Sequence, residues 1–183
     1  MRFQRATLSR LLRRIGYDSR WLTWLGITPD GSGPWPRGFP ILPQGPGDLG
    51  HRMACAARRL PPGPVVIVGS DIPDIAVSDI AAAFRLLGSK DAVFGPASDG
   101  GYWLVGLRRR PRFIDPFQNV RWSSEHALTD TIANLADKDV AILRELSDID
   151  DGSAWHAHTA RTSYQLHRRN SAHEPRRFPR PCS

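Results

Sequence analysis

Two carboxylates follow closely on a segment that is typical of a buried strand. The segment Val65–Val68 is short, β-branched and uncharged, which predicts a strand covered on both faces. Gly69 ends it, and Asp71 and Asp74 come next. Ligands of open α/β sheets bind beyond the carboxyl ends of the strands, where a carboxylate can hold a divalent cation against a phosphate. Asp71 is therefore a candidate metal ligand, although closing a turn explains its position equally well, and for Asp74 capping of the next helix is favoured.

A second cluster, Asp99-Gly100-Gly101, lies between two expected strands at 91–95 and 102–107. Paired glycines allow a backbone to approach a ligand closely, but they also make tight turns. An Asp-Gly-Gly sequence between strands indicates first of all a hairpin. The spacing alone therefore leaves both interpretations open.

The third cluster, Asp148-Ile149-Asp150-Asp151, follows the last expected strand at 140–143. In a parallel sheet this end could face Asp71, and two carboxylates there would hold a divalent ion while leaving positions for phosphates and water. Negative charge at the start of a helix explains the same residues without any metal. Both interpretations remain open here as well.

Several common enzyme signatures are missing. The sequence has no Walker loop, no Gly-x-Ser-x-Gly elbow and no Gly-x-Gly-x-x-Gly. His156 and His158 would point to different faces of a helix, unlike a metal-binding pair spaced by four residues. P-loop NTPases, serine hydrolases and Rossmann dehydrogenases are therefore disfavoured.

The net charge of +7 is concentrated at the two ends of the 183-residue chain. Residues 1–20 hold six Arg and one Asp, and residues 161–183 hold six Arg and one Glu, whereas the part between them is mildly acidic. A basic end can bind polyanions weakly, so a polyanion-binding module is one alternative, but nucleic acid is not the favoured partner. The Arg- and Pro-rich residues 167–183 hold too few apolar side chains to pack and are expected to be a disordered tail.

The remaining residues, 1–166, are expected to form a single domain of a cytoplasmic protein. No apolar run is long enough to span a bilayer, no secretory signal is recognisable, and Cys55 and Cys182 are too far apart to suggest a disulfide framework. Strands alternating with helices predict a three-layer α/β domain with a mainly parallel sheet. The expected helices cover 8–16, 48–60, 77–87, 122–136 and 153–166, and the expected strands 21–27, 39–42, 65–68, 91–95, 102–107 and 140–143.

Taken in order, the motifs resemble a family of bacterial proteins of unassigned function with a glycosyltransferase-A-like fold. Each motif is weak alone, but the combination runs in family order over residues 3–155. The matching stretches are Gln44-Gly45, Gly47–Gly50, Gly69–Asp74, Gly95-Pro96, Asp99–Leu107, Trp122–Ser124 and Asp148–Asp150.

The resemblance implies a sheet of the nucleotide-diphospho-sugar transferase type, shared by glycosyltransferases and nucleotidyltransferases. It implies that Asp71 and Asp150 bind Mg²⁺ or Mn²⁺ on the phosphates of a nucleotide or nucleotide-sugar. It further implies that a group is transferred to an acceptor, with the substrate contacted by Ser70, Asp99, Gly100, Gly101 and Trp122. No catalytic residue is identified.

One departure from the family pattern concerns the start of the fold. Members begin with a strand and a basic, Gly-containing loop that holds the nucleotide, and here the helix expected to follow them comes first. That strand would lie between 21–27 and 65–68, at the centre of the sheet. An N-terminally truncated, catalytically incomplete relative is therefore the main alternative to an active transferase.

Overall fold

The computed structural model describes residues 2–28 and 35–147, with side chains from residue 6 onward. Asp150, the expected helix 153–166 and the expected tail 167–183 lie outside these residues. No helix of the described part is both long and apolar enough to cross a membrane.

The N-terminal helix is amphipathic, as its leucine spacing predicts. Helix α1, Arg2–Leu11, continues into a π-helical turn η1, Leu12–Gly16, and Leu11, Leu12 and Ile15 are buried. A Cβ on Gly16 would lie 2.8 Å from the Phe39 ring, so the glycine lets that ring close over the end of η1.

Helix α2, Leu49–Arg59, begins where its capping residue predicts. The Asp48 carboxylate accepts a hydrogen bond of 2.7 Å from the His51 N–H. At the other end, the Arg109 guanidinium donates to four carbonyl oxygens of the last helical turn and of the segment that follows it, those of Ala57, Leu60, Pro61 and Gly63. Both ends of α2 are therefore satisfied by side chains.

Four strands form the main sheet in the order β3-β5-β4-β6. They are β3 (Val65–Val68), β4 (Ala92–Pro96), β5 (Tyr102–Leu107) and β6 (Val140–Ile142). Strands β3, β4 and β6 share one direction, and β5 alone runs against them. Three of the four strands thus share one direction as predicted, although β5 lies between β3 and β4 and pairs with both in the antiparallel sense. The exception is the hairpin that Asp99–Gly101 indicates, because so short a connection can join only antiparallel strands.

Two short strands form a separate parallel pair. Strand β1, Leu25–Ile27, pairs with β2, Ile41–Pro43, and in the described residues neither is bonded to β3. The strand expected over 21–27 thus forms only in its last three residues.

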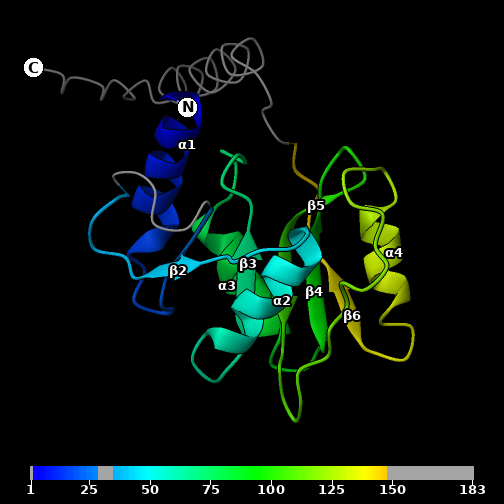
Figure 1. The fold of residues 1–183 in the computed structure, drawn as a ribbon. Coiled ribbons are helices and arrows are strands. Elements are labelled where there is room, and N and C mark those ends of the chain that lie inside the picture. The colour runs from blue at the N-terminus through cyan, green and yellow to red at the C-terminus, as the bar shows by residue number, and fades with distance from the viewer. Residues whose placement is uncertain (1, 29–34, 148–183) are drawn as a thin grey trace, which may run out of the picture. The chain divides into compact units, whose positions relative to one another are not determined.

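Helices cover both faces of the four-stranded sheet, giving the expected three layers (Figure 1). Helices α1 and α3 (Val77–Leu86) share a core with Val66, Val68 and Val93. Helices α2 and α4 (Ala127–Ala133) share the other core with Val65, Ile67 and Phe94. Ala76 rather than Asp74 takes the N-cap position of α3, and the Asp79 carboxylate accepts from the Ala76 N–H at 2.8 Å.

Burial along β3 differs from the sequence-based prediction. Only Val65 is buried, and Val66, Ile67 and Val68 are each half-buried. The reason is that, among the described residues, β3 is an edge strand of its sheet and has only β5 as a neighbour.

Candidate functional site

A cavity of about 630 Å³ collects most of the residues that the sequence singles out. It lies beyond the carboxyl end of β3, beside the β4–β5 hairpin and against α2. Ser70, Asp71, Asp99, Gly101 and Trp122 line it together. Gly100 does not belong to the lining, and Asp150 lies outside the described residues, so a part for either in binding stays a prediction.

Asp71 is exposed and is held by a loop that is anchored on both sides. The Gly69 N–H continues the β3 ladder by donating to the Trp103 carbonyl at 3.0 Å, while Ile72 and Ile75 are buried in the core. A Cβ on Gly69 would lie 2.7 Å from Asp71 Oδ1. The absence of a side chain at Gly69 therefore gives the Asp71 carboxylate its room over the end of the strand.

The hairpin places Asp99 at the same cavity by local hydrogen bonds. Asp99 Oδ1 accepts from the Gly101 N–H at 2.8 Å, and the Ala97 N–H donates to the Gly101 carbonyl at 3.0 Å. Gly100 has a φ of +86°, and a Cβ there would lie 2.3 Å from the Glu125 carbonyl oxygen. Gly100 is thus needed for the turn and for its close contact with the segment before α4.

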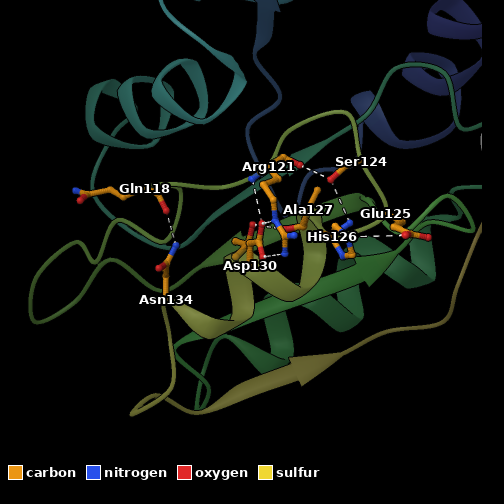
Figure 2. Close-up of polar contacts among 9 residues, drawn as sticks. Gln118, Arg121, Ser124, Glu125, His126, Ala127, Asp130 and Asn134 are labelled. Carbon is orange, nitrogen blue, oxygen red and sulfur yellow. Dashed lines mark hydrogen bonds and ion pairs between the residues drawn. The ribbon is translucent and has the colours of Figure 1, made fainter.

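The segment that carries Trp122 is tied to α4 (Figure 2). Arg121 donates to Asp130 through Nε and Nη2, each at 2.8 Å, and Asn134 Nδ2 donates to the Gln118 carbonyl at 2.8 Å. The hydrogen bonds from Arg121 hold the pKa of Asp130 well below its ordinary value. Ser124 belongs to the same segment, accepting from the His126 N–H and donating to the Arg121 carbonyl.

Trp122 then packs against the start of α2. A Cβ on Gly50 would lie 2.6 Å from Trp122 Cζ2, so this glycine admits the ring. Tyr102 lies edge-on to Trp122, with the ring centroids 6.3 Å apart. Burial raises the pKa of the Tyr102 phenol.

Arg52 is a cavity residue that the sequence motifs do not reveal. Its Nε atom is buried and has no hydrogen-bond partner among the described residues, and the same is true of Trp122 Nε1. A buried donor without an acceptor costs free energy, so both groups are suited to a ligand that brings acceptor oxygens. The sequence does mark Arg52 as unusual. It is the one charged residue on an otherwise apolar face of the helix, and that face lines the cavity with Leu49, Met53 and Ala56.

The acidic residues of the cavity suit a cation that is shared with a phosphate. Asp71 and Asp99 both line it, and within residues 2–28 and 35–147 no three His, Cys, Asp or Glu side chains gather into a metal-binding group. Mg²⁺ commonly takes one or two carboxylates and completes its shell with water and substrate phosphates. The donor set fits that mode rather than an all-protein cage.

Two comparisons place the chain among known proteins. A bacterial family described as "Uncharacterized protein conserved in bacteria (DUF2064)" matches residues 8–124. A crystal structure from Desulfovibrio desulfuricans G20, described as a "putative nucleotide-diphospho-sugar transferase", is 27% identical in sequence with a TM-score of 0.69. The similarity covers 81% of this chain and 69% of that one. No curated protein sequence matches significantly.

Proposed function

This chain belongs to the bacterial family described as uncharacterized proteins conserved in bacteria (DUF2064), and we propose that it is a metal-dependent transferase acting on a nucleotide or nucleotide-sugar. The fold is of the nucleotide-diphospho-sugar transferase type, as its similarity to the Desulfovibrio structure shows. The reaction would move a glycosyl or nucleotidyl group to an acceptor.

The observation that carries this proposal is that carboxylates and a guanidinium group line the same cavity. Asp71 offers carboxylate oxygens to a divalent ion and Asp99 offers acceptor oxygens to a hydroxyl group, whereas Arg52 supplies a cation whose Nε–H has no partner among the described residues. A diphosphate with its divalent ion needs both kinds of group, because the ion binds carboxylates and the phosphate oxygens bind the guanidinium. A purely apolar ligand would leave all three groups unused.

Each group has a distinct part in the proposed mechanism. Asp71 would hold Mg²⁺ or Mn²⁺, assisted by Asp150 as the family resemblance implies, and the ion would neutralise charge on the phosphates. Arg52 would donate to a phosphate oxygen and orient the diphosphate. Ser70, Asp99, Gly101 and Trp122 would contact the sugar or the acceptor, with the Trp122 N–H as a donor.

Calorimetry with the full chain tests the proposal. Mn²⁺ is added together with a panel of nucleoside triphosphates and nucleoside diphospho-sugars, using wild type, Asp71→Ala and Asp137→Ala. Asp137 is a matched control because its side chain is exposed and pairs only with its neighbour Lys138 among the described residues. We expect metal-dependent binding of at least one ligand, lost in Asp71→Ala and kept in Asp137→Ala. The proposal is wrong if no ligand binds in a metal-dependent way, or if both variants behave like wild type.

A further inference from the structure

The loop that carries Asp71 is bonded to the N-terminal helix. We call residues 69–76, which join β3 to α3, the Asp71 loop. The Arg14 guanidinium of η1 donates through Nη1 to two carbonyl oxygens of this loop, that of Pro73 at 2.6 Å and that of Ile75 at 3.1 Å. The Ile75 side chain is buried and shares a core with the apolar face of α1 and η1. The N-terminal helix therefore contacts the loop through a cation and through its apolar face.

Arg144, in the segment after β6, is bonded to the same loop. Its Nη2 donates to the Asp74 carbonyl at 3.0 Å, while Nε and Nη2 also donate to the buried Asp79 carboxylate. The backbone of Arg144 is fixed in turn by Trp103, whose indole Nε1 donates to the Arg144 carbonyl at 3.1 Å. The Trp103 carbonyl accepts from the N–H of Gly69, the first residue of the loop. Both ends of the loop are thus tied to Trp103, one directly and one through Arg144.

The two arginines hold the backbone of the loop and leave its metal-binding candidate unused. Among the described residues, neither guanidinium group is bonded to the Asp71 carboxylate. An ion pair there would compete with a metal ion for the carboxylate oxygens. Asp74 is exposed, so water could satisfy its carbonyl without any arginine. The rigid, planar guanidinium groups therefore restrict the geometry of the loop rather than rescue a buried polar group.

The segment that contains Arg144 also holds the β4–β5 hairpin. The Leu146 N–H donates to the Pro96 carbonyl at 3.0 Å, and the Leu146 carbonyl accepts from the Ser98 N–H at 3.2 Å. One short stretch of chain is therefore bonded both to the Asp71 loop and to the hairpin. It fixes the two carboxylate-bearing loops of the cavity relative to each other.

We propose that Arg14 and Arg144 are positioning residues, which hold the Asp71 loop in the shape that lets Asp71 bind a divalent ion. The inference rests on the proposed function, in which Asp71 is a metal ligand. A carboxylate on an unrestrained loop binds an ion less tightly, because binding must first order the loop. Through Arg14 the N-terminal helix contributes to metal binding, although no described residue of α1 or η1 lines the cavity.

The test compares two neighbouring arginines in the full, ¹³C- and ¹⁵N-labelled chain. Arg14→Met removes the donors to the loop and keeps an aliphatic side chain. Arg13→Met removes the same charge from the same turn, where Arg13 is exposed and takes no part in the described contacts of the loop. In the metal-free protein, we expect Arg14→Met to shift the carboxyl ¹³C signal of Asp71 and the amide signal of Ser70. Arg13→Met should leave both in place, and both variants should keep the melting temperature within a few degrees of wild type.

Calorimetry with Mn²⁺ and uridine diphosphate, and again with guanosine diphosphate, measures the consequence for binding. We expect Arg14→Met to weaken metal-dependent binding at least fivefold and Arg13→Met to bind like wild type. Arg14→Lys should recover part of the loss, because an ammonium group can still donate to a carbonyl. Arg144→Lys keeps the charge beside Asp79 but lacks the planar fork, so it should weaken binding as Arg14→Met does.

Two results would overturn the proposal. One is that the Asp71 signals and the affinities are the same in Arg14→Met and Arg13→Met. The other is that the shifts in Arg14→Met spread through the sheet as far as Val93 and Leu107, since Arg14 would then support the fold in general. If wild type binds no nucleotide together with Mn²⁺, the proposed function fails, and the Asp71 signals of the metal-free variants still decide whether Arg14 positions the loop.

Discussion

The position of the Asp71 carboxylate depends on what its neighbour lacks. A Cβ on Gly69 would lie 2.7 Å from Asp71 Oδ1, which is too close for both atoms to keep their places. We expect Gly69→Ala to displace the carboxylate and weaken metal-dependent nucleotide binding at least tenfold. The φ of Gly69 is not positive, so the fold should tolerate alanine.

The measurement for Gly69→Ala pairs calorimetry with thermal unfolding. A melting temperature within a few degrees of wild type, together with the affinity loss, would assign the effect to the carboxylate. Unchanged affinity would show that Asp71 does not need its observed orientation.

Arg52 provides a second test at the scale of one residue. Its buried Nε has no partner among the described residues, so a phosphate oxygen would gain a charge-assisted hydrogen bond of about 1.5–3 kcal/mol. We expect Arg52→Gln to weaken nucleotide binding roughly ten- to a hundredfold by that estimate, without lowering the unfolding free energy. Arg85→Gln is the matched control, because Arg85 is exposed on α3. If both variants bind the nucleotide with equal affinity, Arg52 does not contribute to nucleotide binding.

At the scale of elements, one ion pair ties α3 to the segment after β6. Arg144 donates through Nε and Nη2 to the Asp79 carboxylate at 2.9 and 2.7 Å, and Asp79 is 9% exposed. Burial alone would raise the pKa of Asp79, but the hydrogen bonds from Arg144 and from the Ala76 N–H outweigh it and lower the pKa. The Asp79–Arg144 pair therefore favours the ionised carboxylate in the folded state.

This pair gives stability a defined pH dependence. Because the folded pKa is lowered, its contribution is complete above the ordinary Asp pKa of about 4 and is lost as the pH falls through the folded pKa. We expect Asp79→Asn to cost about 1–3 kcal/mol at pH 7, with the difference from wild type shrinking below about pH 4. Urea unfolding across pH measures it.

Asp139→Asn is the control for the pH series. The Asp139 side chain is 72% exposed and lies 3.8 Å from Lys90, an arrangement that contributes little. A difference between Asp79→Asn and wild type that does not change with pH would contradict the assignment to the Asp79 carboxylate.

Elements with strong local signals were predictable from sequence. The β-branched run of β3 and the Asp48 cap of α2 fix those elements locally, and Asp99–Gly101 specifies its hairpin. Strand β1 is shorter than its pattern because only Leu25–Ile27 finds a partner strand in the described part of the chain. Helix α4 begins at Ala127 rather than near Trp122, because the segment before it is held in a turn in which Ser123 has a φ of +56°.

The site was predictable in part. Ser70, Asp71, Asp99, Gly101 and Trp122 meet because each follows or borders an element whose place the sheet order decides. Arg52 was not predicted because its helical spacing shows only that it shares a face with apolar residues of α2, and tertiary packing decides that this face turns toward the cavity. The half-burial of Val66–Val68 was not predicted for a similar reason, because a β-branched pattern does not distinguish an edge strand from a central one.

At the scale of the whole molecule, the sheet and the candidate site depend on each other. The cavity that holds Asp71 is continuous with the space between β1 and β3, because Gly26, Ile67 and Val68 line it as well.

The central claim is that a divalent ion and a nucleotide bind together at this cavity. Its most direct test is paramagnetic broadening of amide signals by Mn²⁺ in the presence of a nucleoside diphosphate or diphospho-sugar. The account predicts that the signals of Ser70, Asp71 and Gly101 and the Trp122 indole disappear first, while those of Val65 and Leu107 at the other end of the sheet persist. Broadening centred away from the cavity, or the same broadening in Asp71→Ala, would contradict it.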